Sequence, residues 1–165
     1  MTDLAFTLAA ERTEDLPNIE RLHERAFGPG RFARTAFRLR EGVPPRLDLS
    51  RVARVGSMLV GSNRLTRIHV GGRPALLLGP LTVEPAFRSR GIGMALMAAC
   101  LSAATEAGEQ LVILVGDEPY YGRIGFQRVP PGRLVLPGPV DPNRLLVKEL
   151  VPDAFATLSG AVTGG

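Results

Sequence analysis

Two kinds of apolar spacing alternate along the chain and predict a mixed α/β fold. A short apolar segment near the N-terminus is followed by two segments in which apolar residues recur with the helical period. This pattern predicts a strand at residues 6–10 and helices at residues 15–27 and 31–41. Segments rich in glycine and proline follow at residues 28–30 and 42–45, and they end the two helices.

The middle of the chain is rich in predicted strands, at residues 51–55, at residues 58–63 leading on to 69, and at residues 74–83. The Gly71-Gly72 turn between the last two strands indicates an antiparallel meander. Residues 75–83 are apolar almost throughout, so both faces of this strand are expected to be covered. Gly79-Pro80 interrupts the strand. Because proline cannot donate to a sheet ladder, this pair predicts a bulge.

The second half of the chain contains the clearest strand–helix–strand unit. An apolar helix ends at Ala107, and a buried strand is predicted at residues 111–115. Such a crossover joins parallel strands. A brief helical segment containing Tyr120 and Tyr121 follows, and the last strands are predicted at residues 126–129, 133–136 and 145–150. The expected fold is a mixed, mostly antiparallel sheet of about six to seven strands, with a parallel pair in the middle and about four flanking helices.

Length and composition support one globular domain over residues 1–165, with residues 152–165 as a short appended tail. The chain is 45% hydrophobic and 22% charged, which is typical of globular proteins. The first residues lack a basic region, and no apolar run reaches the ~18–20 residues that span a bilayer. We therefore expect a cytoplasmic protein with no membrane partner.

The charged residues and the single cysteine restrict the candidate chemistry. The net charge is +4, and Lys148 is the only lysine, so arginine carries nearly all the positive charge. Arginine forms bidentate hydrogen bonds with phosphate and carboxylate, although scattered arginines also occur simply as solvated surface residues. Neither a recognition motif nor an aromatic platform accompanies them, so we expect no nucleic acid partner. Cys100 lies in an apolar stretch, which predicts a buried, inert thiol.

The turn between the strand at residues 74–83 and the following helix is a candidate anion site. Its glycines let backbone N–H groups converge on a phosphate at the positive end of the helix dipole. A nucleotide P-loop would need Gly-Lys-Ser/Thr, which is absent, and a dinucleotide fingerprint would need a small residue where Leu96 stands. The pattern that does match is Arg/Gln-x-x-Gly-x-Gly/Ala, through Arg88, Gly91 and Gly93.

This pattern and a second motif resemble the GNAT superfamily of N-acetyltransferases. The second motif is Tyr-x-x-x-Gly-Phe, present from Tyr121 to Phe126. Residues 78–83, 116–123 and 147–152 are further similar to the YhbS-like branch of bacterial acetyltransferases. The resemblance extends over residues 4–160 and is strongest over residues 74–130.

The resemblance implies that acetyl-CoA is the co-substrate and that no metal is needed. It would lie in a V-shaped opening where the bulged strand splays from the strand at residues 111–115. Main-chain groups of Leu81 and Val83 would bind the pantetheine arm and polarise the thioester carbonyl. The amides of residues 88–94 would bind the pyrophosphate. The expected cofactor-binding residues are Leu81, Thr82, Val83, Arg88, Ser89, Arg90, Gly91, Ile92, Gly93 and Met94.

The implied reaction is direct attack of a neutral primary amine on the thioester in a ternary complex. Tyr121 is the expected acid for the departing thiolate, since a phenol stays protonated at neutral pH. Tyr120 is a second catalytic candidate and would line the acceptor pocket. Where some members carry a glutamate base, this chain has Leu77. The remaining candidates for the base are water, Glu84, Asp117 and Glu118.

The acceptor is left open, as a small-molecule or peptide amine. In this superfamily it is usually recognised by the first two helices, here residues 28–41. Four arginines occur there, and they favour either an acceptor that carries carboxylate or phosphate, or a solvated helix face. They are Arg31, Arg34, Arg38 and Arg40. A non-catalytic acyl-CoA-binding regulatory module is the alternative function, and the sequence is compatible with a homodimer.

Overall fold

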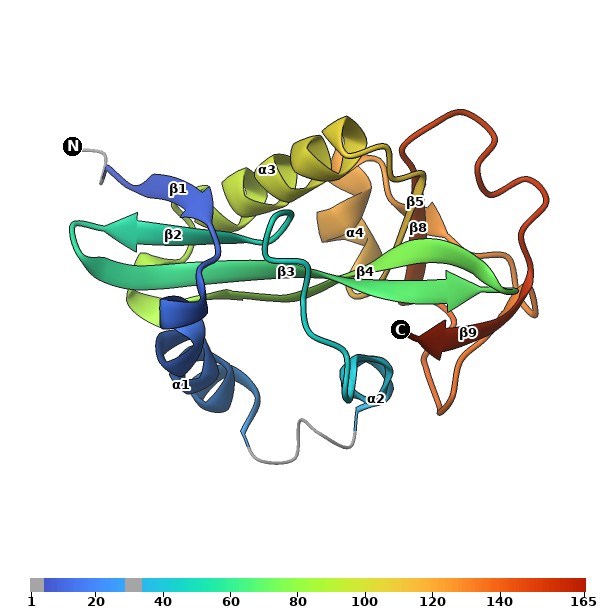
Figure 1. Cartoon of the computed structure of the whole chain (residues 1–165), viewed down its shortest axis with the longest axis horizontal. Helices are drawn as coiled ribbons and strands as arrows, with labels where there is room; N and C mark the ends of the chain where they lie inside the picture. The colour runs from blue at the N-terminus through green and yellow to red at the C-terminus, as the bar shows by residue number, and fades with distance from the viewer. Residues whose placement is uncertain (1–4, 29–33) are drawn as a thin grey trace.

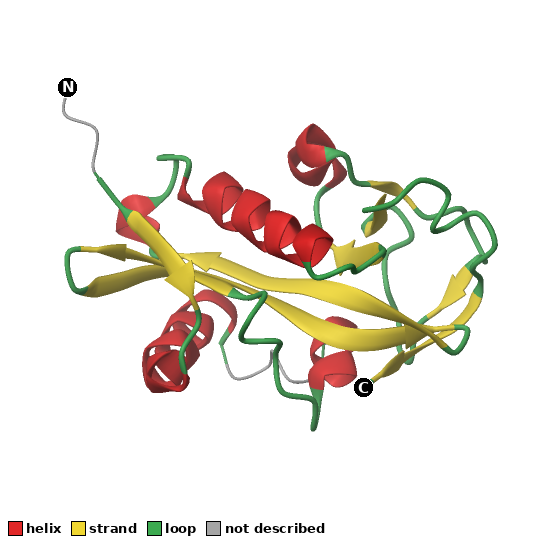
Figure 2. Cartoon of the chain, turned by 45° about the horizontal axis from the view of Figure 1, so that its top comes forward, coloured by secondary structure: helices red, strands yellow, loops and turns green. Residues whose placement is uncertain are grey.

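The apolar segments of the chain form the strands of one mixed sheet (Figures 1 and 2). A computed structural model describes residues 5–28 and 34–165, and within these ranges the sheet has nine strands. They are β1 (Thr7–Ala10), β2 (Arg51–Val55), β3 (Met58–Val70), β4 (Arg73–Val83), β5 (Leu111–Val115), β6 (Gln127–Arg128), β7 (Leu134–Val135), β8 (Leu145–Glu149) and β9 (Gly160–Gly164).

The strand order places β4 and β5 side by side in the middle of the sheet. The main path runs β1-β2-β3-β4-β5-β8-β6, and β9 pairs with both β3 and β7. Neighbours are antiparallel except for β4 with β5 and β7 with β9. The predicted meander and the predicted parallel pair are therefore confirmed.

Helices cover both faces of the sheet. α1 (Leu16–Phe27) and α2 (Thr35–Arg40) lie against one face, and α3 (Ile92–Glu106) lies along the other, as Figure 2 shows edge-on. α4 (Glu118–Tyr121) follows β5, and short 3₁₀ turns occupy Thr13–Asp15, Pro85–Phe87 and Gly122–Ile124. The described part of the second predicted helix is shorter than expected, and residues 31–33 of that prediction lie outside the described residues.

Consecutive leucines of β4 show that the apolar strand is covered on both sides. Leu76 is buried in the cluster that contains Cys100 of α3, whereas Leu77 is buried in the cluster that contains Leu39 of α2. Both are at most 1% exposed. Successive side chains of a strand point to opposite faces, so one near-continuous apolar run supplies both layers of the core.

The predicted bulge lies at Gly79-Pro80 and marks the place where β4 leaves β5. Leu78 pairs with Leu65 and Leu81 pairs with Asn63, so Gly79 and Pro80 together stand opposite a single residue of β3. Gly79 has φ 113°, a backbone conformation that glycine adopts readily. The parallel pairing of β4 with β5 ends at Leu77 and Ile113. Beyond this pair, the two strands separate.

The described sheet has nine strands instead of the expected six to seven, and the C-terminal strand β9 lies outside every segment predicted as a strand. Its apolar signal is weak because Val162 is its only buried residue. Main-chain contacts position it instead: the Gly71 N–H donates to the Ala161 carbonyl at 2.9 Å. Gly164 approaches α2 closely, and a Cβ atom there would lie 2.5 Å from the Leu39 carbonyl oxygen.

Cys100 lies fully buried in the core, as predicted. Burial raises the pKa of its thiol from 9.0 to about 12, so it stays a neutral thiol. Among residues 5–28 and 34–165, no helix is long and apolar enough to cross a membrane. The same residues contain no group of three or more histidine, cysteine, aspartate or glutamate side chains arranged to hold a metal.

Candidate functional site

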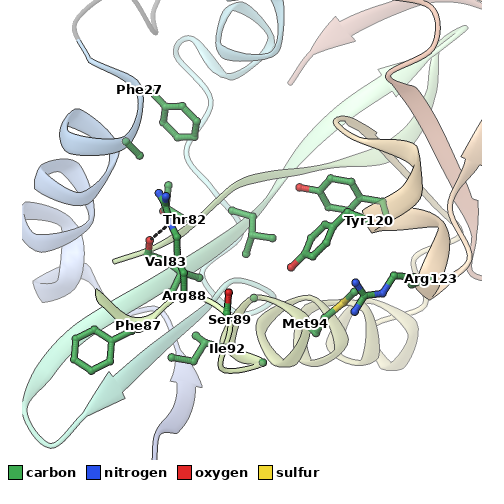
Figure 3. A pocket seen from close by; sticks show the side chains of 15 residues that line it. Phe27, Thr82, Val83, Phe87, Arg88, Ser89, Ile92, Met94, Tyr120 and Arg123 are labelled. Carbon is green, nitrogen blue, oxygen red and sulfur yellow. Dashed lines mark hydrogen bonds between the residues drawn. The ribbon is translucent and has the colours of Figure 1, made fainter. Parts of the chain in front are cut away.

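A cavity of about 610 Å³ opens where β4 ends and α3 begins (Figure 3). Nine of the ten residues predicted to bind the cofactor line it, and the exception is Arg90. The Arg90 guanidinium lies 5.9 Å from the centre of the Phe87 ring instead. Residues from β4, the α3 entry loop and α4 therefore converge on one hollow. The cavity is lined by Ala26, Phe27, Leu81, Thr82, Val83, Phe87, Arg88, Ser89, Gly91, Ile92, Gly93, Met94, Tyr120, Tyr121 and Arg123.

The entry to α3 is built to expose backbone donors. Gly91, the N-cap, has φ 82°, and Ser89 also adopts a left-handed conformation with φ 63°. The helical hydrogen bonds begin with Ala95 N–H to the Gly91 carbonyl at 3.0 Å, and no side chain caps the first turn. The N–H groups of this turn therefore have no acceptor within the helix, and no acidic residue opposes an anion there.

The main chain at the end of β4 presents its N–H groups to the gap left by β5. Glu84 N–H donates to the Val60 carbonyl of β3 at 2.8 Å. Because N–H groups alternate between the two edges of a strand, those of Val83 and Leu81 face the opposite edge. That edge lies beyond the last β4–β5 pair. The N–H groups of Leu81 and Val83 therefore face the side of β4 that β5 leaves uncovered.

Tyr120 reaches across the cavity to the first turn of α3. A Cβ atom on Gly93 would lie 2.7 Å from the Tyr120 hydroxyl, so the hydroxyl occupies the space that any larger residue would fill. The Arg123 guanidinium lies 5.7 Å from the centre of the Tyr120 ring. Burial raises the pKa of Tyr120, and Arg123 partly opposes the rise.

Tyr121 is the more buried of the two tyrosines. Its ring packs on the backbone of Gly116, where a Cβ atom would overlap it, and meets the Phe126 ring edge-on at 6.2 Å. Burial raises the pKa of Tyr121 to about 12, with smaller contributions from neighbouring groups that include Tyr120 and Asp117. The phenol therefore remains protonated at any physiological pH.

A second cavity of about 470 Å³ adjoins the first beside Leu81, the residue that follows the bulge. Four residues line both cavities: Phe27, Leu81, Tyr120 and Tyr121. The second cavity extends toward α2, and Gly79 and Pro80 form part of its wall. Its lining combines apolar side chains with five charged ones, namely Arg34, Arg40, Arg144, Asp117 and Asp141. Two pockets thus approach the separated strands from different sides, with the tyrosines between them.

The three candidate base residues occupy different places. Glu84 forms an ion pair with Arg25, and Glu118 lies 3.1 Å from the Arg128 guanidinium. Neither carboxylate lines either of the two cavities. Asp117 lines the second cavity, and its side chain is 75% exposed. Leu77, the residue at the position of a family glutamate, is buried in the core.

The arginines of the predicted acceptor region also differ from one another. Arg31 lies outside the described residues. Arg34 and Arg40 line the second cavity, whereas Arg38 is exposed and does not. Sequence reasoning did not identify Phe27, Asp141 or Arg144 as candidate site residues. Phe27 carries no motif, and residues 139–144 lack any periodic pattern, so only the folded chain brings them to the site.

Comparison with known proteins agrees with this geometry. A family model described as an acetyltransferase (GNAT) domain matches residues 50–128. The uncharacterized N-acetyltransferase YjhQ of Escherichia coli K12 is 31% identical over 131 residues, which cover 77% of this chain and 72% of YjhQ.

Two further relatives extend the similarity to the whole chain. The uncharacterized N-acetyltransferase YhbS of Escherichia coli K12 is 27% identical over 150 residues, which cover 90% of this chain and 89% of YhbS. The crystal structure of Escherichia coli YhbS in complex with CoA matches with a TM-score of 0.84 at 25% identity, covering 100% of this chain and 92% of that one. A GNAT acetyltransferase from Brucella melitensis, solved with acetyl-CoA, shares the fold with a TM-score of 0.74 at 24% identity, covering 98% and 97% of the two chains. This chain therefore belongs to the GNAT family of acetyltransferases, is similar to its YhbS members, and is an acyltransferase.

Proposed function

We propose that this chain transfers the acetyl group of acetyl-CoA to a primary amine, which attacks the thioester directly in a ternary complex. The observation that carries the proposal is that two cavities adjoin each other, with Leu81 and Tyr121 in the wall of both. One cavity would hold the cofactor and the other the acceptor. Two substrates bound in this way would meet at the separated strands, and such proximity removes much of the entropic barrier to a bimolecular reaction.

The cavity beside α3 fits the diphosphate and pantetheine of CoA. The first-turn N–H groups of α3 lack intrahelical acceptors, and the helix dipole favours a negative charge there. Arg88 lines the same cavity and adds a positive charge. The YhbS and Brucella structures contain CoA and acetyl-CoA respectively, which supports the same ligand class here. The cofactor supplies the activated acyl thioester.

Leu81 and Tyr121 would share the stabilisation of developing charge. The Leu81 N–H, directed into the gap beside β5, is suited to donate to the thioester oxygen as it gains negative charge. The Tyr121 hydroxyl is suited to donate a hydrogen bond to the leaving sulfur. Its pKa of about 12 lies well above the ~8.5 of a thiol, so complete proton transfer is uphill by ~1.4 kcal/mol per pKa unit. Tyr121 therefore acts mainly as a hydrogen-bond donor to the thiolate.

Asp117 is the proposed acceptor of the amine proton, directly or through water. It is the only one of the three candidate carboxylates that lines the second cavity. Glu84 and Glu118 are each engaged by an arginine outside the cavities. Tyr120 would contact the cofactor near Gly93 and also border the acceptor, since it lines both cavities.

We further propose that the chain functions as a single domain. The tail supports this view because β9 pairs with β3 and β7, so it extends the same sheet. The acceptor would be a small molecule or peptide, in keeping with a cavity of about 470 Å³ that borders exposed residues.

The decisive experiment measures CoA binding and CoA release separately. Calorimetry tests whether the protein binds CoA, and a thiol-release assay over an amine panel tests transfer. We expect binding together with amine-dependent release that falls in Tyr121→Phe. Absence of CoA binding would overturn the proposal. Binding without amine-dependent release would support the non-catalytic acyl-CoA-binding module instead. That module is the main alternative function because Leu77 stands where some family members carry a glutamate base.

A further inference from the structure

Arg40 is a cation with no carboxylate partner among the described residues. Its Nη2 lies 3.5 Å from the Leu78 carbonyl oxygen, and its guanidinium lies 5.1 Å from the centre of the Phe37 ring. Its Nε is buried and makes no hydrogen bond. Burial and the nearby Arg64 lower the pKa of Arg40 from 12.5 to about 9, so the side chain is still charged at pH 7.

Two other arginines with little exposure, Arg64 and Arg67, are paired with carboxylates. Arg64 binds Glu11 in a bidentate manner, at 3.0 and 2.8 Å, and both side chains are buried. Arg67 binds Glu109 through two contacts, at 2.8 and 2.6 Å. Removing a cation from water costs several kcal/mol unless an anion compensates it. Arg40 therefore lacks a partner that the fold supplies to similar residues.

The unpaired guanidinium borders the place where the acceptor would react. Arg40 lines the second cavity, and a Cβ atom built on Gly79 would lie 3.0 Å from its Nη2. The same built atom would lie 3.6 Å from the Leu81 nitrogen, the proposed donor to the thioester oxygen. Because both distances are measured from the same built atom, Arg40 Nη2 and the Leu81 nitrogen lie no farther apart than the sum of the two.

We propose that Arg40 binds a carboxylate of the acceptor and that the acceptor is an amino acid or a similar molecule whose amine and carboxylate are only a few bonds apart. This inference rests on the proposed function, because it takes the second cavity to be the acceptor pocket. A carboxylate on Arg40 would complete the missing ion pair. The short distance from Arg40 to Leu81 then limits how far the attacking amine can be from that carboxylate.

The remaining charges of the cavity suit a zwitterionic ligand. Asp117 and Asp141 line it together with Arg34 and Arg144, so groups of both signs are available to an ammonium and a carboxylate. Arg144 lies 3.8 Å from Asp117, and Arg34 lies 5.3 Å from the centre of the Phe27 ring. Arg40 is distinct from these residues because its Nε is buried without a partner.

Helix α2 also provides a matched control. Arg38 lies two residues before Arg40 in the same helix, but it is exposed and does not line the acceptor cavity. Arg38→Met and Arg40→Met remove the same charge from the same short helix. A difference between the two variants therefore reports on the position of the guanidinium and not on net charge.

The test compares free amino acids with their amides, in which the carboxylate is neutral. For each pair that is acetylated, the ratio of kcat/KM for acid over amide is measured in wild type, Arg40→Met, Arg40→Lys and Arg38→Met. We expect the ratio to fall about tenfold or more in Arg40→Met, mainly through KM for the acid. Arg40→Lys should recover part of the preference, and Arg38→Met should change the ratio less than twofold. A loss confined to kcat, equal for acid and amide, would overturn the proposal and indicate contact with the thioester oxygen instead.

A binding experiment tests whether Arg40 binds a carboxylate even if no amine in the panel is acetylated. Protein saturated with CoA is titrated with N-acetylglycine and with N-acetylglycinamide, which mimic the two products. We expect tighter binding of the acid to wild type and to Arg38→Met, and no difference in Arg40→Met. Equal binding of acid and amide to wild type would overturn the role of Arg40. Failure to bind CoA would instead overturn the proposed function.

Discussion

The hydroxyl of Tyr120 lies so close to Gly93 that a Cβ atom at residue 93 would come within 2.7 Å of it. The same Cβ atom would lie 3.9 Å from the side chains of Leu81 and Val83. The glycine at this position of the motif therefore does more than free a backbone amide. Because Gly93 has no side chain, the Tyr120 side chain of α4 can lie against the first turn of α3.

Gly93→Ala should weaken CoA binding about tenfold or more while leaving stability nearly unchanged. The added methyl group displaces Tyr120 and narrows the cavity, but alanine is favoured over glycine in a helix by up to ~1 kcal/mol. Calorimetry with CoA and urea unfolding measure the two effects. Gly93→Ala combined with Tyr120→Phe removes the contacting oxygen, so the double variant should bind CoA better than Gly93→Ala alone.

Gly91→Ala is the contrasting variant for this prediction. Gly91 has φ 82° and no atom within 4 Å of a built Cβ, so alanine would add backbone strain without a clash. It should lower the unfolding free energy by ~1 kcal/mol, and Tyr120→Phe should not rescue it. If Tyr120→Phe rescued both glycine variants equally, contact between Tyr120 and residue 93 would not be the cause.

Motif and strand patterns anticipated most residues that line the first cavity. The bulge, the parallel pair and the nine predicted residues that line this cavity depend on local sequence signals, namely a glycine-rich turn and a proline in an apolar strand. These signals are short in range. They can therefore be recognised without knowing which residues pack against these segments in the folded chain.

The lining of the second cavity could not be predicted in the same way. The sequence alone does not distinguish Arg38 from Arg40, yet Arg38 is exposed and Arg40 lines the second cavity. Which of them faces the sheet depends on the packing of Leu39 against β9 and the core. Strand β9 escaped prediction for a related reason, since main-chain pairing and a close glycine contact place it, with little apolar surface.

Tyr121→Phe should lower kcat about 10- to 100-fold with little change in the KM for acetyl-CoA. The ring would still pack against Gly116 and Phe126, so only the hydrogen bond to the leaving sulfur is lost. Steady-state kinetics with both substrates varied provides the measurement. A rise in KM with unchanged kcat would instead indicate that the hydroxyl serves ground-state binding.

For an acceptor without a carboxylate, which does not need the Arg40 cation, the pH profile of kcat/KM should rise with pH and show no alkaline decline below about pH 10.5. The attacking amine must be neutral, which produces the acidic limb. The pKa of Tyr121 is raised to about 12, so this donor stays protonated across the measured range. Rates between pH 6 and 10.5 test the expectation. An alkaline decline near pH 9 that disappears in Tyr121→Phe would contradict the raised pKa.

Cys100 should not react with a thiol reagent in the native protein. Its side chain is fully buried and its pKa is raised from 9.0 to about 12. The fold favours the neutral thiol. The contribution of buried Cys100 to the free energy of unfolding is therefore fully present below pH 9 and is lost as pH rises toward 12. Titration with a disulfide reagent should find one thiol in denatured protein and none in native protein at pH 8. Reaction of one equivalent in native protein would show that the thiol is accessible.

Removing Arg64 should lower the free energy of unfolding, whereas removing Arg40 should not. Arg64→Met would leave Glu11, which is 5% exposed, without its bidentate partner, and we expect a loss of ~3–5 kcal/mol. Arg40→Met removes a charge that no carboxylate of the described chain compensates, while a side chain of similar length keeps the contact with Phe37. We therefore expect its unfolding free energy to be unchanged or up to ~1 kcal/mol higher, as found where a binding site retains charge at the expense of stability. Urea unfolding at pH 7 without ligand measures both variants. If Arg40→Met were as destabilising as Arg64→Met, the cation at residue 40 would have a structural partner within the chain, and the carboxylate of an acceptor would not be needed to complete it.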